Sequence, residues 1–191
     1  MARILVGVGG SIAAYKACDL VSKLVQAGHV VDVAMTRAAL RFVRPLSFSA
    51  LTHRPVFTDR SWFEGSGPAE HLAATREAAL LIVAPCTANL LGQFAHGLAD
   101  EIVAATVLGA SCPLLVAPAM NTRMWAHPRV QANVRTLEGD GVAFVGPASG
   151  YLAEAERGLG RLAEPEEIVA ASEKLLAVSK PPRPPSQRSK R

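Results

Sequence analysis

The stretch RILVGVGGSIAAYK, residues 3–16, decides the fold of this chain. Residues 3–8 form an apolar run typical of a buried β-strand, and the segment from Ile12 to Ala27 has the apolar spacing of an amphipathic helix. Gly9 and Gly10 lie between them and allow a tight turn. Strand, turn and helix in this order form the first half of a βαβ unit, so the stretch predicts an α/β fold.

The same turn is a candidate phosphate site, although it matches neither common phosphate-binding motif. Ile12 stands where the third glycine of GxGxxG belongs, and the chain has no GxxxxGK[ST]. Free backbone N–H groups at the start of the helix favour an anion beside Gly10 and Ser11. Thr36, at the end of the next predicted strand, is a second candidate ligand. For Ser11 and Thr36 the alternative is that each hydroxyl only caps a helix.

The rest of the chain repeats the alternation of strand and helix. Further apolar runs predict strands at 29–35, 79–84, 113–118 and 141–146, with a short one at 55–57. Helical spacing recurs between them, for example from Pro128 to Leu137. Strands that are apolar on both faces indicate a parallel sheet covered by helices on each side. We therefore expect one domain, residues 1–178, with a doubly wound, mainly parallel, Rossmann-like sheet whose ligand lies beyond the carboxyl ends of the strands.

The distribution of charge argues against a nucleic-acid-binding protein. The 191 residues carry a formal net charge of +4, but the Pro-rich segment 179–191 holds five of the 20 basic residues and none of the 16 acidic ones. Residues 1–178 therefore have a net charge of −1, which argues against nucleic-acid binding. We interpret 179–191 as a disordered basic tail, either solubilising or an electrostatic docking segment.

The cysteines and the hydropathy indicate the compartment. Cys18, Cys86 and Cys112 have neither the spacing of a metal site nor the even number of a secreted disulfide framework. No apolar run approaches the roughly 18 residues that a membrane span requires, and the N-terminus does not read as a signal peptide. These observations predict a cytoplasmic protein that binds no metal and no membrane.

Two further loops are expected at the ligand-binding edge of the sheet. APCTAN, residues 84–89, follows the third of the long strands, and PAMNTRMW, residues 118–125, follows the fourth. The small side chains of the first loop let a flat ring approach the backbone. Met120 and Met124 in the second loop offer polarisable packing against an aromatic surface.

Together with GGSIAAYK, His71 and AHGLAD, these loops closely resemble the homo-oligomeric flavin-containing cysteine decarboxylases. PAMNTRMW is the most specific part, since it fits the family's PxMNxxMW at every fixed position. The family includes phosphopantothenoylcysteine decarboxylase and enzymes that decarboxylate the C-terminal cysteines of ribosomal peptides. The resemblance implies FMN, whose single phosphate has no need of the third glycine. It also implies the cofactor ligands, with Gly10, Ser11 and Thr36 at the phosphate and Cys86, Thr87, Ala88, Ala119 and Met120 around the isoalloxazine ring.

The chemistry of such an enzyme follows from its substrate. A cysteine residue has no place for the electrons that remain when its carboxylate leaves as CO₂. Oxidation at Cβ supplies one: a base removes the thiol proton, hydride passes to the flavin, and the resulting C=S group accepts the electrons to give an enethiolate. The resemblance makes His71, in a helix predicted at 69–78, the base, and Asn121 the ligand of the substrate carboxylate. Met124 is a further substrate contact. The alternatives are a surface histidine and an Asx cap.

One difference from the family decides our interpretation of the substrate. Members that make pantetheine phosphate carry a cysteine in a Gly-x-x-Ala-Cys stretch of a mobile loop, where this chain has Glu154. Without that thiol we expect the reaction to stop at the enethiol. The first hypothesis is therefore FMN-dependent oxidative decarboxylation of the C-terminal cysteine of a ribosomally synthesised peptide, giving an aminoenethiol for a ring-forming partner enzyme. The surrounding loop, 147–163, is expected to close over the substrate and to bring Glu154 to it.

Two alternatives stay open. The chain is a phosphopantothenoylcysteine decarboxylase of coenzyme A biosynthesis, or a regulatory flavin-binding protein of the same fold without catalysis. Retention of His71 and Asn121 argues against the second. The resemblance also implies a homo-trimer or dodecamer, with the flavin near a subunit boundary.

Overall fold

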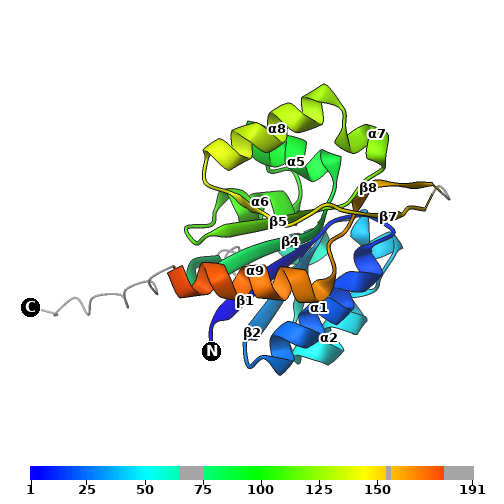
Figure 1. Ribbon diagram of the computed structural model, residues 1–191. Helices are drawn as coiled ribbons and strands as arrows, with labels where there is room; N and C mark the ends of the chain where they lie inside the picture. The colour runs from blue at the N-terminus through cyan, green and yellow to red at the C-terminus, as the bar shows by residue number, and fades with distance from the viewer. Residues whose placement is uncertain (65–74, 154–155, 179–191) are drawn as a thin grey trace, which may run out of the picture.

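The computed structural model describes residues 1–64, 75–153 and 156–178, and a six-stranded parallel sheet forms its centre (Figure 1). Across the sheet the strands are ordered β3 (Val56–Thr58), β2 (Val30–Met35), β1 (Arg3–Val8), β4 (Leu80–Cys86), β5 (Leu114–Pro118) and β6 (Ala143–Phe144). Every pairing in this sheet is parallel. The order reverses between β1 and β4, which in a doubly wound fold is where a ligand binds. The expected single-domain α/β fold is confirmed.

Helices cover both faces of the sheet (Figure 1). One face is covered by α1 (Ala14–Gln26), α2 (Pro45–Thr52) and α9 (Pro165–Val178), the other by α5 (Ala88–His96), α6 (Ile102–Leu108) and α8 (Pro128–Gly139). The helix α1 forms where apolar residues recur at helical spacing, and its buried residues are Ala14, Ala17, Leu20, Val21 and Leu24. Shorter helices are η1 (Ala39–Arg41), α3 (Asp59–Glu64) and α7 (Thr122–Trp125). No helix in the described ranges is long and apolar enough to cross a membrane.

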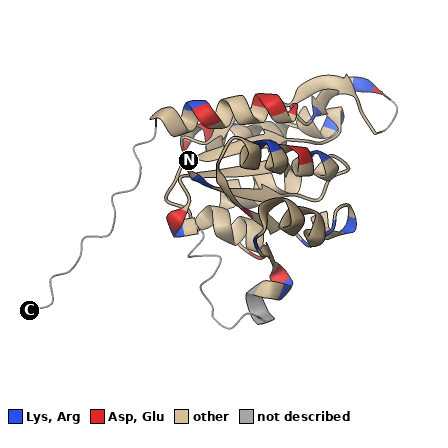
Figure 2. Cartoon of the chain, turned by 90° about the horizontal axis from the view of Figure 1, so that it is seen from below, with Lys and Arg blue, Asp and Glu red and all other residues tan. Residues whose placement is uncertain are grey.

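Charged residues lie mainly on the helices and at the ends of the strands (Figure 2). Asp32 in β2 is an exception, because it is only 1% exposed. Its two carboxylate oxygens accept hydrogen bonds from Arg3 Nε and Arg54 Nε, each at 2.6 Å. This buried carboxylate therefore ties β1 and the segment before β3 to β2.

Each end of every predicted strand lies within two residues of the observed end, but the last strand is shorter than expected at both ends. We expected a strand at 141–146, but β6 pairs only at Ala143 and Phe144. The reason is local: Gly141 and Gly146 have φ values of +87° and +78°, which end an extended segment on both sides. Of the predicted helix 69–78, residues 75–78 are described: 75–77 are helical and Ala78 is not.

The expected lid at 147–163 is an antiparallel hairpin rather than an irregular loop. Its strands are β7 (Ala148–Tyr151) and β8 (Arg157–Arg161), which pair with each other and not with the main sheet. Figure 1 shows the hairpin extending from the body of the molecule near α7. Glu154, between β7 and β8 in the sequence, lies outside the described residues, as do His71 and the basic tail 179–191.

Candidate functional site

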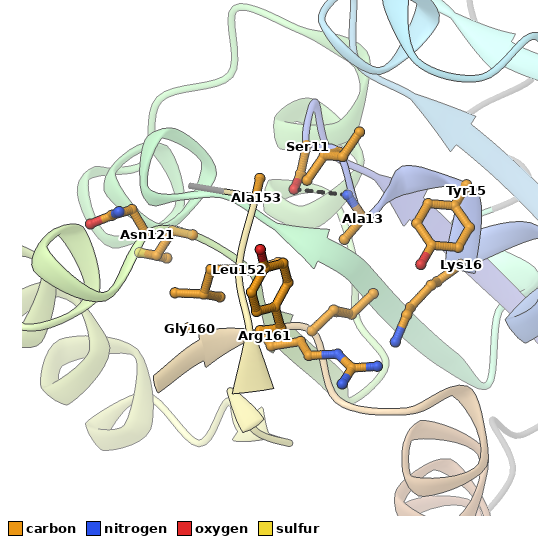
Figure 3. Close-up of a pocket in the computed structure, with 14 residues that line it drawn as sticks. Ser11, Ala13, Tyr15, Lys16, Asn121, Leu152, Ala153, Gly160 and Arg161 are labelled. Carbon is orange, nitrogen blue, oxygen red and sulfur yellow. Dashed lines mark hydrogen bonds between the residues drawn. The ribbon is translucent and has the colours of Figure 1, made fainter. Parts of the chain in front are cut away.

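Two adjacent cavities lie beyond the carboxyl ends of the central strands. The first has a volume of about 440 Å³ and is formed by the loops that follow β1, β2, β4 and β5. The second, of about 400 Å³, lies between the start of α1, the loop after β5 and the hairpin (Figure 3). Ser11, Ala119 and Met120 line both. The structure thus forms two compartments with one shared wall, at the position where the strand order reverses.

The first cavity brings together most of the residues that the sequence assigns to a cofactor. Seven of the eight line it, namely Gly10, Ser11, Thr36, Thr87, Ala88, Ala119 and Met120. Cys86 does not: its side chain is fully buried in the core, and its Sγ lies 3.8 Å from the Thr87 carbonyl oxygen. Burial raises the pKa of the Cys86 thiol far above its usual range, so this thiol stays protonated.

Glycine is required in the turn after β1 because the neighbouring chain is too close for a side chain. A Cβ added at Gly9 would lie 2.8 Å from Leu90 Cδ1 and closer still to the Pro85 carbonyl oxygen. At Gly10 the added atom would collide with Ala38. Neither glycine has a left-handed φ, so close approach and not backbone conformation is the reason for both. The turn is consequently a tight cradle at the base of the first cavity.

The two hydroxyl groups beside this cradle accept local hydrogen bonds and remain open donors. Ser11 Oγ accepts from the Ala13 N–H at 3.2 Å, and Thr36 Oγ1 accepts from the Ala39 N–H at 3.0 Å. These bonds order the turns before α1 and η1, but neither residue is the N-cap, which is Ala13 in α1 and Ala38 in η1. Each hydroxyl still has its own proton to donate, and within the described residues the Gly10 N–H donates to no protein acceptor. These donors fit a phosphate group.

The start of α5 adds further donors to the first cavity. Thr87 is the N-cap, and its side chain accepts from the Leu90 N–H at 3.4 Å. Ala88 and Asn89 follow in the first turn, where backbone N–H groups have no carbonyl partner within the helix. Small residues and exposed donors at one edge suit a flat, polar ring. The chemistry of this cavity therefore fits a flavin mononucleotide.

Glu101 is a residue of the first cavity that sequence reasoning missed. It is 9% exposed and accepts a hydrogen bond from the Arg37 N–H at 3.3 Å. Desolvation raises the pKa of this carboxyl group, with the Asp59 charge adding to the effect and the Arg37 contacts opposing it. The motif AHGLAD, which directly precedes Glu101, was the only signal of it in the sequence.

Asn121 lines the second cavity and also caps α7. Its Oδ1 accepts from the Arg123 N–H at 2.7 Å, which is the Asx cap that the sequence allowed. Because the cap uses only the carbonyl oxygen, the two N–H donors of the amide remain for a ligand. Met124, 48% exposed, lines the first cavity instead. The PAMNTRMW loop thus contributes to both compartments.

The hairpin is attached to this loop through glycines. Gly160 accepts the Met120 N–H through its carbonyl at 2.9 Å. A Cβ at Gly160 would collide with the Met120 carbonyl oxygen, and one at Gly158 would collide with Thr122 Oγ1. The sequence RGLGR therefore lets β8 lie directly on the loop that carries Asn121.

The second cavity holds two cations that the sequence did not single out. Lys16 comes from α1, within the motif GGSIAAYK, and Arg161 ends β8. Tyr15 and Tyr151 line the same cavity. The described residues include no cluster of His, Cys, Asp and Glu that could hold a metal ion.

Comparisons with known proteins agree with this geometry. Residues 1–177 match the family model described as Flavoprotein. The chain is 48% identical over 175 residues to the coenzyme A biosynthesis bifunctional protein CoaBC of Bacillus subtilis, covering 92% of this chain but only 43% of that protein. It is 39% identical to a probable phosphopantothenoylcysteine decarboxylase of Streptococcus mutans, covering 91% of this chain and 98% of the relative. The chain therefore spans less than half the length of the bifunctional relative and nearly all of the other.

Solved structures give the same picture. A PPC decarboxylase mutant complexed with pantothenoylaminoethenethiol superposes with a TM-score of 0.84 at 30% identity, covering 91% of this chain and 97% of that one. The FMN-dependent cysteine decarboxylase SpaF superposes with a TM-score of 0.80 at 33% identity, covering 94% and 97%.

These relatives overturn our first hypothesis on the substrate. We expected a peptide with a C-terminal cysteine and a ring-forming partner enzyme, on the basis of Glu154 alone. The curated relatives are named for coenzyme A biosynthesis and for phosphopantothenoylcysteine, and they resemble this chain over its whole described length. One changed residue is weaker evidence than similarity over more than nine tenths of the chain, so the peptide interpretation was wrong.

Proposed function

Because this chain belongs to the Flavoprotein family, and within it to the flavin-dependent cysteine decarboxylases, we propose that it decarboxylates phosphopantothenoylcysteine. The observation that carries the proposal is the similarity to a probable phosphopantothenoylcysteine decarboxylase over 98% of that relative's length. The two-cavity site supports it, because the cavities are adjacent and share lining residues, so that a cofactor bound in one and a substrate bound in the other would be neighbours, as hydride transfer requires.

The expectation of FMN as the cofactor is confirmed by the family and by its FMN-dependent members. We assign the phosphate to Gly10, Ser11 and Thr36, and the ring to the start of α5 together with Ala119 and Met120. When bound there, a flavin supplies reversible two-electron oxidation of the cysteine Cβ. The side chains and backbone of the first cavity position it and exclude water from one face.

The residues of this chain have three further tasks in the proposed reaction. The amide N–H donors of Asn121 bind the substrate carboxylate and hold it beside the shared wall until it leaves as CO₂. His71 accepts the thiol proton, as the resemblance implies. The hairpin covers the second cavity, so that the enethiolate is kept from bulk water.

The position of Glu154 raises a question of proton supply. In pantetheine-forming relatives the resemblance places a cysteine there, which assists protonation as the enethiol is reduced to the final thiol. We assign this proton to the Glu154 carboxyl group. Glu154→Gln should then arrest the reaction at the enethiol, with a product about 46 Da lighter than the substrate, whereas the unaltered chain gives the saturated thiol, about 44 Da lighter.

The decisive experiment is an anaerobic incubation of the FMN-loaded protein with phosphopantothenoylcysteine, followed by mass spectrometry. We expect many turnovers per flavin with a loss of about 44 Da, because reduction of the enethiol to the final thiol would return the two electrons and leave no need for an outside acceptor. Asn121→Asp should bind FMN normally but lose turnover, since it places a carboxylate against the substrate carboxylate. A folded, FMN-loaded protein that leaves phosphopantothenoylcysteine unchanged would refute the proposal. The homo-trimer or dodecamer stays a prediction, tested by light scattering of the loaded protein.

A further inference from the structure

The second cavity ends in a small cluster of charges. Lys16 Nζ lies 2.8 Å from Glu164 Oε2, and Arg161 Nη2 lies 2.7 Å from Glu164 Oε1. One carboxylate therefore holds two cations that come from α1 and β8, which are far apart in the sequence. These three residues together carry a charge of +1, and the neighbouring Glu166, which also interacts with Lys16, is paired with Lys23.

The environment of this cluster strengthens its field. The Lys16 side chain is only 12% exposed. The neighbouring wall of the cavity is largely apolar, with Ile12, Tyr15, Leu152 and Leu162. The Lys16 hydrogen bond lowers the pKa of Glu164, so its carboxylate remains charged at neutral pH and keeps both cations in place. A net positive charge beside apolar walls attracts anions more strongly than one in open solvent.

The cluster lies at the end of the cavity away from the reacting groups. Figure 3 shows Lys16 and Arg161 on one side of the pocket and Asn121 on the opposite side. The Arg161 side chain crosses β7 at Gly150: a Cβ added there would lie 2.8 Å from Arg161 Cδ, so a larger residue at this position would force the arginine to shift. The cavity thus has a carboxylate-binding end and a cationic end.

We propose that Lys16 and Arg161 bind the terminal phosphate of the substrate and so select phosphorylated over unphosphorylated pantothenoylcysteine. This inference rests on the proposed function, whose substrate carries a cysteine carboxylate at one end and a phosphomonoester at the other. A guanidinium fork suits phosphate oxygens, and an ammonium group supplies a compact second charge. Glu164 pairs with both cations, and its negative charge competes with the phosphate for them.

The test compares two products that differ only by the phosphate. Calorimetric titration of the FMN-loaded protein with 4′-phosphopantetheine and with pantetheine gives a ratio of dissociation constants without any turnover. We expect Lys16→Gln and Arg161→Gln each to weaken binding of the phosphorylated product about 10-fold to 100-fold, the usual range for a charge-assisted hydrogen bond. Binding of pantetheine should stay unchanged in both. Arg161→Lys should recover part of the loss, because it retains the charge.

Glu164→Gln distinguishes phosphate binding by Lys16 and Arg161 from a purely structural role of their ion pairs. If the cations bind phosphate, removing the shared carboxylate raises the net charge of the cluster and should tighten 4′-phosphopantetheine. If the three residues only brace the hairpin, all three glutamine variants should weaken both products alike. Lys23→Gln is the matched control on α1, since Lys23 pairs with Asp19 and Glu166 outside the cavity.

The outcomes distinguish this inference from the proposed function. A protein that decarboxylates phosphopantothenoylcysteine while Lys16→Gln and Arg161→Gln keep the wild-type ratio overturns the inference alone. A protein that does not decarboxylate phosphopantothenoylcysteine at all overturns the proposed function and the inference with it.

Discussion

Gly160→Ala tests whether the hairpin holds the PAMNTRMW loop, residues 118–125, in its position. Gly160 has a φ of +152°, and a Cβ there would lie well within 3.0 Å of the Met120 carbonyl oxygen, a distance that real Cβ atoms essentially never show. That oxygen belongs to the backbone, so no side-chain rotation relieves the contact, and the loop must retreat by roughly 1 Å. A backbone conformation of this kind costs about 1–3 kcal/mol. A displacement of about 1 Å at a reacting site costs up to about 100-fold in rate.

We therefore expect Gly160→Ala to lower the free energy of unfolding by about 1–3 kcal/mol and kcat/KM by about 10-fold to 100-fold. Urea unfolding and a decarboxylation assay on the FMN-loaded protein measure the two effects. Gly139→Ala is the control, because a Cβ there meets no atom within 4 Å and the residue ends α8. Wild-type kcat/KM in Gly160→Ala would show that the hairpin does not position Met120 and Asn121.

Three further outcomes follow from the described contacts. Gly10→Ala should fold but lose FMN, because its Cβ collides with Ala38 in the turn assigned to the phosphate. After gel filtration the flavin absorbance at 450 nm should fall by about 10-fold or more. A variant that keeps its flavin absorbance would contradict the assignment of the phosphate to this turn. Asp32→Ala should lose about 3–5 kcal/mol of stability in urea, since two arginines would face a site without its carboxylate, and a loss below about 1 kcal/mol would mean that solvent replaces it. Glu101→Gln should melt at a higher temperature than the wild type above about pH 5. The pKa of Glu101 is raised in the folded state, so its protonated form stabilises the wild type below the ordinary carboxyl pKa. The wild type loses this stability as the pH rises, whereas glutamine stays neutral. A constant difference in melting temperature from pH 4 to pH 8 would contradict the assigned cause.

The fold could be predicted where a single segment carries its own signal. The strand β1, the turn and α1 each follow from apolar spacing within a few residues, and so do four other strands. The strand β6 could not be bounded from the sequence, because its length depends on two left-handed glycines rather than on hydropathy. The hairpin was missed for a related reason. Its sequence lacks the alternation of side chains that marks a strand, because three positions are glycine: Gly150, Gly158 and Gly160. Their role, to make room for Arg161, Thr122 and Met120 respectively, is visible only in the folded chain.

The candidate site also has parts that follow from single segments and parts that appear only in the folded chain. The grouping of residues around the first cavity could be predicted because most of them lie in short motifs that directly follow strands. The cationic end of the second cavity could not, since Lys16 and Arg161 meet only through Glu164 in the folded chain. The substrate was assigned incorrectly because the difference at Glu154 is visible in one sequence, whereas the similarity that outweighs it is a property of the whole chain.

The wall shared by the two cavities makes their ligands thermodynamically dependent on each other. Ser11, Ala119 and Met120 face both compartments, so an adjustment of these residues to one ligand alters the fit of the other. Coupling of this kind is reciprocal: the factor by which FMN changes the affinity for 4′-phosphopantetheine equals the factor by which 4′-phosphopantetheine changes the affinity for FMN. Under the proposed function, a rise in the concentration of 4′-phosphopantetheine would retain more of this protein in the flavin-loaded form whenever that factor exceeds one.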